Sequence, residues 1–209
     1  MTSSGEQLYA VAVGNTQGVW TSRKEADAQC AGHAMPLVKP CKSRDEADAF
    51  VALFRGPDPV VVVYVDGACS SNGRSGARAG VGVFWGTDDV RNVSRPVRGL
   101  HTNNVAELEA AGDAFRAIAR DKDFLTTRYC VVTDSQYVLN ILTKWYKAWE
   151  GRGWVGSAGG PIKNLPLIHD VYAAYECVKE RTNVAHVRGH AGIPGNEHAD
   201  KLACQGALA

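Results

Sequence analysis

The valine run at positions 60–65 constrains the fold of this 209-residue chain more than any other segment. It consists of five valines and one tyrosine, with no alternating polar residue, directly after Pro57-Asp58-Pro59. A β-branched run of this kind is typical of a central strand that is buried on both faces. No apolar run in the sequence is longer, and six residues fall far short of the roughly 20 that a membrane helix needs. We therefore expect a sheet covered by helices and no membrane partner.

The rest of the C-terminal part alternates between strand-like and helical patterns. In its first long helix, Leu108, Ala111, Phe115 and Ile118 recur at intervals of three and four residues. An antiparallel start followed by alternating strands and helices predicts an α/β fold, a mixed five-stranded sheet flanked by helices. The expected strands are 60–65, 79–85, 90–97, 129–133 and 183–187, and the expected helices are 103–120, 135–142, 167–179 and 196–203.

Two prolines and a glycine within positions 55–59 predict a boundary between two units. We expect a small α+β module at 1–55, a short linker at 56–59 and a larger domain at 60–209. Two capping boxes, Ser22 with Glu25 and Ser43 with Glu46, predict helices that run to about 30 and about 54. Strands are expected at 8–13, 19–21 and 37–38.

Charge and cysteine usage limit the class of protein. Lys and Arg number 23 against 22 Asp and Glu, which excludes a wholly basic nucleic-acid coat but allows a local basic patch. The six cysteines are scattered without a C-x-x-C pair, so neither a disulfide framework nor a thiolate metal site is expected. The start of the chain lacks the features of a targeting peptide. These patterns indicate a reduced, intracellular compartment, the nucleus or the cytoplasm.

Four acidic residues lie at strand ends and helix starts, where α/β folds often place their active sites. Asp66 and Asp134 each follow an expected strand, while Glu107 and Asp200 lie early in expected helices. Alone, each has an ordinary explanation as a turn former, helix cap or surface residue. If they converge, they cannot stay ionised together without cations, and two Mg²⁺ ions would relieve the repulsion.

Four ordered motifs carry a resemblance over nearly all of residues 60–209. They are Asp66-Gly67-Ala68-Cys69-Ser70-Ser71-Asn72-Gly73, Thr102-Asn103-Asn104-Val105-Ala106-Glu107, Thr133-Asp134-Ser135, and Gly189-His190-x-Gly192-x-x-Gly195-Asn196-Glu197-x-Ala199-Asp200. In these motifs the chain resembles the cellular type 1 ribonuclease H family.

The resemblance implies an endonuclease that hydrolyses the RNA strand of RNA–DNA hybrids and leaves 5′-phosphate and 3′-hydroxyl ends. Asp66, Glu107, Asp134 and Asp200 would bind two Mg²⁺ ions, with Mn²⁺ as a substitute, and His190 would assist product release or proton transfer. The motif selects Glu107 rather than Glu109, which we expect to face solvent. Two alternatives are a non-catalytic hybrid-binding protein and another polynucleotidyl transferase of this broad fold, such as an integrase or exonuclease.

The resemblance also implies how each strand is read. Asn72, Asn103 and Asn104 would contact RNA 2′-hydroxyl groups, although an isolated Asn103 is equally a helix N-cap. Residues 144–154, the tryptophan segment, hold three of the five tryptophans, and Trp145 and Trp149 could instead cover one helix face. The arginine often found at position 100 is leucine here, and Arg98 is a candidate replacement. The residues implied for the DNA strand are Thr102, Tyr137, Trp145, Trp149, Ser157 and Asn164.

The N-terminal module resembles the hybrid-binding domain that often precedes these nucleases, with Tyr9, Lys39 and Lys42 as its candidate contacts. Its binding face departs from the family: Arg23 and Val38 stand where aromatics are usual, and Pro40 replaces a lysine. Residues 1–55 carry six basic and six acidic groups. Weak hybrid affinity, a protein partner and a packing role all remain open for this module.

Overall fold

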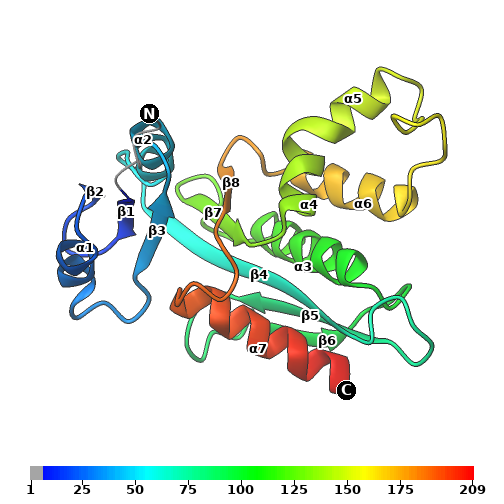
Figure 1. Cartoon of the computed structure of the whole chain (residues 1–209), viewed down its shortest axis with the longest axis horizontal. Helices are drawn as coiled ribbons and strands as arrows, with labels where there is room; N and C mark the ends of the chain where they lie inside the picture. Colours follow the sequence, from blue (N-terminus) through cyan, green and yellow to red (C-terminus); the bar gives the residue numbers. More distant parts are fainter. Residues whose placement is uncertain (1–6) are drawn as a thin grey trace, which may run out of the picture.

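The computed structural model describes residues 7–209 and contains two sheets (Figure 1). A three-stranded antiparallel sheet in the order β2-β1-β3 belongs to the N-terminal module, and a five-stranded mixed sheet in the order β6-β5-β4-β7-β8 forms the larger part. The expected fold class is confirmed. Residues 1–6 of the predicted 1–55 module lie outside the described residues.

The module and the sheet of the larger part use the following elements. The module contains β1 (Leu8–Val13), β2 (Gly18–Trp20), α1 (Arg23–Cys30), β3 (Leu37–Cys41) and α2 (Arg44–Ala52). The larger part contains β4 (Val60–Ser70), β5 (Arg78–Phe84), β6 (Val93–Pro96), α3 (Asn103–Ile118), β7 (Arg128–Thr133), α4 (Gln136–Asn140), a π-helical turn (Ile141–Trp145), α5 (Tyr146–Glu150), α6 (Leu165–Glu176), β8 (Thr182–His186) and α7 (Pro194–Leu208).

Strand β4 is the centre of the sheet and is longer than the valine run. It pairs parallel to β7 and antiparallel to β5, and the antiparallel ladder continues to Ser70 opposite Arg78. Asp66 therefore lies within the strand rather than after it. The parallel ladder ends at Val65 opposite Thr133, which brings Asp66 and Asp134 to the same end of adjacent strands.

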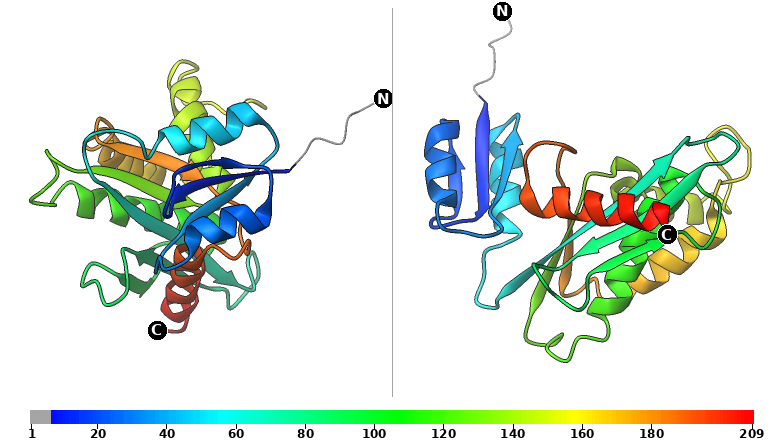
Figure 2. Two further views of the ribbon diagram at one scale, coloured as in Figure 1. Left: turned by 90° about the vertical axis from the view of Figure 1, so that its left-hand side faces the viewer. Right: turned by 90° about the horizontal axis from the view of Figure 1, so that it is seen from below.

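The two faces of the sheet have different covers. Val63, Val65 and Val131 belong to a buried cluster with α3 and α6, whereas Tyr64 and Val132 belong to a second cluster that includes residues of α7. Figure 2 shows α7 lying across β4 and β5 on one side of the sheet. The valine run is thus covered from both sides, as a central strand in a layered α/β fold requires, with residues 63–65 buried and residues 60–62 partly buried.

The second cluster also contains the N-terminal module. Ala10 and Ala12 of β1, Phe50 and Val51 of α2, and Phe54 just after α2 are buried together with residues of β7 and β8. The residues contributed by β7, β8 and the following loop are Cys130, Val132, Ala185, Val187 and Ile193. A unit of this size is marginal by itself, and this contact gives it a shared core. The module therefore packs against the larger part of the chain, and a packing role was one of the alternatives left open by the sequence.

Strands β3 and β4 and helix α7 run further than predicted, and two other predicted elements also differ from the structure. Residues 90–92 do not extend β6, because the Asn92 side chain accepts a hydrogen bond from the Trp85 N–H and donates one to the Gly86 carbonyl, which closes a turn. The helix predicted at 135–142 continues through the π-helical turn into α5, so the tryptophan segment begins on helix. All six cysteines are free. Among the described residues, no helix has the length and apolar character needed to cross a membrane.

Candidate active site

The four predicted carboxylates converge. Asp66, Glu107, Asp134 and Asp200 line one cavity of about 270 Å³. They come from β4, α3, the end of β7 and α7, so that segments far apart in the sequence meet at one point. The remaining lining residues are Gly67, Ala68, Asn103, His190, Asn196 and Glu197.

Glycines allow the helices to bring their acids to the strands. A Cβ atom on Gly67 would lie 2.3 Å from the Glu107 backbone nitrogen, so only glycine lets the start of α3 approach β4 this closely. On the opposite face, a Cβ atom on Gly82 would lie 2.1 Å from the Ala199 carbonyl oxygen, one residue before Asp200. Close backbone contact at these two glycines therefore positions Glu107 and Asp200.

Burial and mutual repulsion make the cluster costly to ionise. Asp66 is only 9% exposed, and burial, followed by the charge of Asp134, raises its pKa to about 8, against a lowering contribution from the Gly67 N–H, which donates at 2.7 Å. Burial also raises the pKa of Glu107 to about 7, while hydrogen bonds from Ser135 and Asn103 act in the opposite direction. Such perturbed carboxylates in a cleft mark a functional site.

Three polar side chains hold these carboxylates in place. Asn103 Nδ2 donates to Glu107 Oε1 at 2.7 Å, and Ser135 Oγ donates to Glu107 Oε2. Asn196 Nδ2 donates to Asp134 Oδ2 at 3.2 Å, and its Oδ1 is buried without a hydrogen-bond partner among the described residues. Ser135 and Asn196 were given no role from the sequence. Their places inside the acidic motifs were the only available signal.

The donor set suits a divalent cation. Carboxylate oxygens are the hard ligands that Mg²⁺ prefers. Burial is the main cause of the raised pKa of Asp66, and a bound cation would relieve the repulsion from Asp134 that adds to it. Within residues 7–209, no group of three acidic, histidine or cysteine side chains is arranged as a metal centre.

His190 stands at the rim of this cavity. Its side chain is exposed and its backbone is left-handed, with φ at 52°. The preceding Gly189 packs against Asp134, since a Cβ atom there would lie 2.6 Å from the Asp134 carboxylate. The loop thus places an imidazole beside the acids while leaving it open to solvent.

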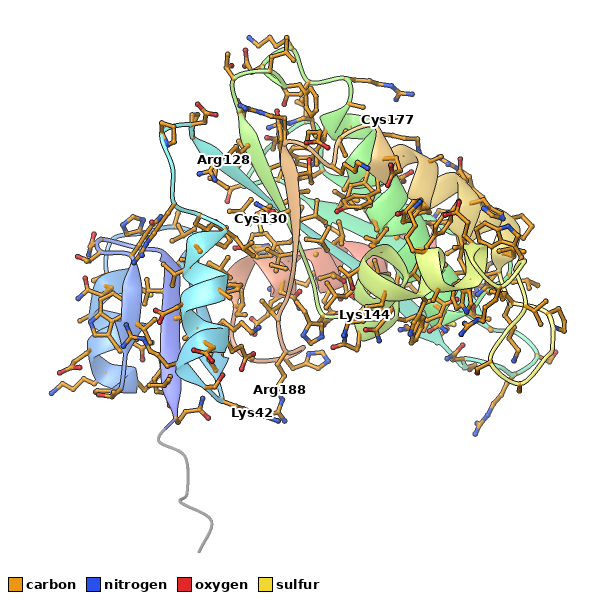
Figure 3. All side chains as sticks on the ribbon, turned by 90° about the horizontal axis from the view of Figure 1, so that it is seen from above. Lys42, Arg128, Cys130, Lys144, Cys177 and Arg188 are labelled. Atoms are coloured by element: carbon orange, nitrogen blue, oxygen red, sulfur yellow. The ribbon has the colours of Figure 1, made fainter. Side chains whose placement is uncertain are left out.

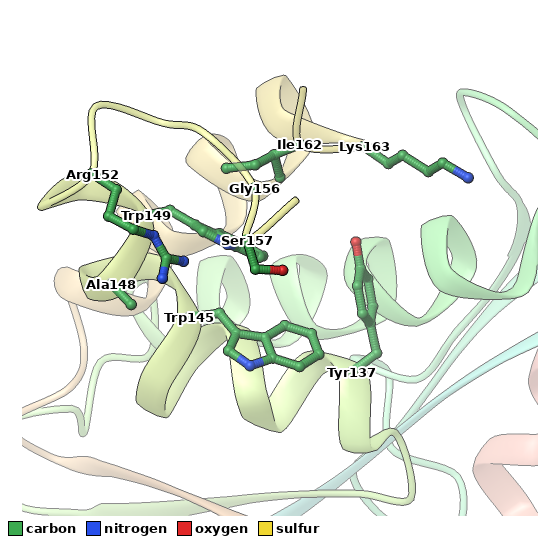
Figure 4. A pocket seen from close by; sticks show the side chains of 9 residues that line it. All are labelled: Tyr137, Trp145, Ala148, Trp149, Arg152, Gly156, Ser157, Ile162 and Lys163. Atoms are coloured by element: carbon green, nitrogen blue, oxygen red, sulfur yellow. The ribbon is translucent and has the colours of Figure 1, made fainter. Parts of the chain in front are cut away.

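The tryptophan segment forms one wall of a second, larger cavity of about 510 Å³ (Figure 4). Tyr137 and Trp145 meet edge to face at 6.0 Å between ring centroids, and Trp145 and Trp149 lie 5.7 Å apart. Ser157 also lines this cavity, with Arg152 on one side of it and Lys163 on the other. The tryptophans thus face a cavity as well as covering a helix, which suits stacking on a nucleic-acid strand.

Four of the predicted contact residues surround a third cavity of about 410 Å³, together with Leu100 and Lys163. They are Asn72, Thr102, Asn104 and Asn164. Thr102, rather than Asn103, is the N-cap of α3, because its hydroxyl accepts from the Val105 N–H at 3.3 Å. Arg98 lies in the neighbouring groove, 3.9 Å from Asp113, so Lys163 is the cation that lines this cavity.

Comparison with known proteins now identifies the family. The sequence profile of RNase H matches residues 58–208, which hold all four carboxylates and the tryptophan segment. The chain belongs to the ribonuclease H family. A second profile, the ribonuclease H1 N-terminal domain, matches residues 7–51, so the resemblance of the module is also confirmed.

Several members of the ribonuclease H family are similar over most of this chain. Ribonuclease H1 of Homo sapiens is 38% identical over 181 residues, which is 85% of this chain and 58% of the human protein. Ribonuclease H1 of Mus musculus is 33% identical over 90% of this chain and 65% of its own length. The chain therefore spans about three fifths of these relatives. The crystal structure of LC9-RNase H1, a type 1 RNase H with the type 2 active-site motif, is 36% identical with a TM-score of 0.53 over 74% of each chain.

One residue of the ribonuclease H motifs was predicted wrongly. Glu109 does not face solvent: it is 5% exposed, and its carboxylate accepts from Arg95 at 2.6 Å and from the Arg98 N–H at 2.9 Å. Arg95 comes from β6 and also pairs with Asp113. A buried ion pair of this kind links α3 to the edge of the sheet, and no spacing in the sequence signals it.

Two of the three candidate hybrid contacts in the N-terminal module already interact with other side chains of the module. Lys39 pairs with Glu46 at 3.0 Å, and its ammonium lies 5.3 Å from the Phe50 ring centroid. The Tyr9 ring lies under the Arg23 guanidinium. Lys42 alone of the three predicted contacts is an exposed charge without an ion-pair partner among the described residues.

Proposed function

We propose that this protein is an endonuclease that hydrolyses the RNA strand of RNA–DNA hybrids. The observation that carries the proposal is the convergence of Asp66, Glu107, Asp134 and Asp200 in one cavity, where burial raises the pKa of two of them. Two ribonuclease H1 relatives at 33–38% identity support the same reaction class. In this proposal residues 1–55 and 60–209 are separate domains joined by 56–59.

The four carboxylates would hold two Mg²⁺ ions, for which Mn²⁺ could substitute. When bound, these ions would make water a sufficient nucleophile at neutral pH and neutralise the charge on the leaving 3′-oxygen, which gives 5′-phosphate and 3′-hydroxyl ends. Ser135 and Asn103 fix both oxygens of Glu107, and Asn196 orients Asp134. His190, at the solvent-facing rim, is suited to carry the proton released in the reaction or to help the product leave.

The surroundings of the acids suggest how the strands are told apart. Asn72 and Asn104 present amides, which can both donate to and accept from a 2′-hydroxyl group. Of the three asparagines, Asn103 is the one that lines the cavity of the carboxylates, and its side-chain N–H already donates a hydrogen bond to Glu107. The DNA strand would lie against Tyr137, Trp145, Trp149 and Ser157, with a phosphate held near Thr102 and Asn164.

Strand selectivity tests the proposal. A hybrid labelled in turn on its RNA and its DNA strand, incubated with the protein and Mg²⁺, should lose only the RNA label, since the DNA strand has no 2′-hydroxyl group to be recognised. Double-stranded RNA and double-stranded DNA of the same sequence serve as controls. Equal cleavage of double-stranded RNA would contradict the proposal that 2′-hydroxyl groups are recognised on one strand only. Binding of the hybrid without any cleavage would identify a non-catalytic hybrid-binding protein.

A further inference from the structure

The N-terminal module is fixed to one end of the catalytic sheet. Its apolar residues share one buried cluster with β7 and β8. The connection contributes polar contacts as well: Asp58 pairs with Arg181 at 2.9 Å, and the Arg128 N–H donates to the Pro59 carbonyl. The labelled side chain of Arg128 reaches back toward this connection, where a Cβ atom on Gly56 would touch its guanidinium at 2.9 Å (Figure 3).

This docking sets the direction of α2. The chain leaves the end of α2 and enters the start of β4, which runs parallel to β7 and β8. The end of α2 therefore lies toward the amino ends of these strands, and its start lies toward their carboxyl ends, where Asp134 lies (Figure 3). The left view of Figure 2 shows α2 and β8 side by side and running in opposite directions. In Figure 3 the labelled side chains of Lys42, two residues before α2, and Arg188, two residues after β8, lie at the same edge of the molecule.

Lys42 and Arg188 are both free to meet an anion. Both side chains are exposed, and neither forms an ion pair within residues 7–209. The neighbouring cations of the module are occupied, since Lys39 pairs with Glu46 and Arg44 pairs with Asp48. Glu46 also accepts from the Lys42 N–H, so its carboxylate is engaged on two sides.

Of the two cations, Arg188 is the one next to the proposed active site. It directly precedes Gly189, which packs against the Asp134 carboxylate, and it lies two residues before His190 at the cavity rim. A duplex whose scissile phosphate sits over the four carboxylates would extend past Arg188 toward the module. Two exposed cations near this edge offer partners for its phosphates.

We propose that Lys42 of the docked module and Arg188 of the β8–α7 loop form a composite phosphate-binding surface that holds the hybrid backbone beyond the cleavage site. This inference rests on the proposed function, because the ligand is the same RNA–DNA hybrid. Because the module is docked, Lys42 is already held in position and no freedom of a tethered domain is lost when it binds. A contact that is weak alone therefore adds directly to hybrid binding by the catalytic part. In this proposal the module contacts the hybrid through Lys42 rather than through the surface around Lys39, where the sequence departs from the family.

The salt dependence of hybrid binding tests this surface. Binding is measured by fluorescence anisotropy in Mg²⁺ with the Asp134→Asn variant, so that the hybrid stays intact. Adding Lys42→Ala and Arg188→Ala should lower the slope of log affinity against log salt by about one for each lost cation and weaken binding about tenfold. The loss should appear with a hybrid of about 20 base pairs, two helical turns, and fade with one of about 10 that fills only the catalytic cleft.

A matched control removes one lysine and one arginine elsewhere. Lys24 on α1 and Arg120 after α3 are also exposed and unpaired within the described part of the chain, and their replacement by alanine should leave the slope unchanged. A silent Lys42→Ala change, or an equal loss with long and short hybrids, would overturn the composite surface. If the unaltered protein fails to cleave any hybrid, the proposed function fails instead, so the two failures are distinguishable.

Discussion

Replacing Asp66 by asparagine is expected to reduce RNA cleavage by about 1000-fold or more while raising the unfolding temperature of the metal-free protein. The loss of activity follows from the removal of one of the four carboxylates that line the cavity. The gain in stability follows from burial, because Asp66 is 9% exposed and is repelled by three other acids. Asparagine keeps the shape of the side chain without its charge.

The gain in stability should depend on pH in a defined direction. In the folded metal-free protein the pKa of Asp66 is about 8, far above its ordinary value of 3.8, so the folded state holds a proton that the unfolded state has already released. The contribution of this group to stability is therefore fully present below about pH 4 and is lost progressively as the pH rises to about 8. The variant lacks this loss, so its advantage should grow between about pH 5 and about pH 8.

Thermal unfolding followed by circular dichroism, in a chelator and at several pH values, measures this effect. Asp123→Asn, on an exposed turn, is the matched control and should change neither activity nor the pH profile. Mg²⁺ should stabilise the unaltered protein more than the Asp66→Asn variant, because only the former keeps the full set of carboxylates. An Asp66→Asn protein that is less stable than the parent at every pH would contradict the repulsion argued for the cluster.

Gly82→Ala is expected to destabilise the protein by about 3 kcal/mol or more and to impair cleavage. The added methyl group would lie 2.1 Å from the Ala199 carbonyl oxygen and 2.7 Å from the Ala203 nitrogen, both backbone atoms of α7. Neither can rotate away, so α7 must move off the sheet. Asp200 follows Ala199 directly and would move with it, away from Asp66, whose strand pairs with Gly82.

Urea denaturation and a cleavage assay on the same preparation measure both effects. Gly86→Ala is the matched control, since a Cβ atom there meets nothing within 4 Å and the residue has no left-handed backbone. It should change the free energy of unfolding little. A Gly82→Ala protein with parental stability would show that α7 is not held at this close approach.

The sheet and the acids were predictable because their signals are local. A run of valines without alternation needs cover on both faces, and the structure provides it. The acids were predicted from short motifs, and the register of Val65 opposite Thr133 explains why Asp66 and Asp134 meet. The capping boxes likewise predicted the helix starts at Ser22 and Ser43, whereas the N-cap of α3 is Thr102 rather than the suggested Asn103.

Features that depend on distant partners were not predictable. The burial of Glu109 requires Arg95 on another element, and its position two residues after Glu107, a proposed metal ligand, gives no sign of it. The docking of the module requires Phe54 to meet a sheet face formed much later in the chain. In sequence, the apolar stripe of α2 looks like that of any helix on its own small sheet, so the second contact carries no separate pattern.

The central claim is that the four carboxylates form a metal-dependent centre that cuts RNA in a hybrid, and a Mg²⁺ titration of single-turnover cleavage tests it most directly. With an end-labelled RNA strand, the unaltered protein should be inactive in a chelator and gain activity as Mg²⁺ is added, releasing products with 5′-phosphate and 3′-hydroxyl ends. Asp134→Asn should stay inactive throughout the titration. Cleavage that persists in the chelator, or in the Asp134→Asn variant, would contradict this account of the site.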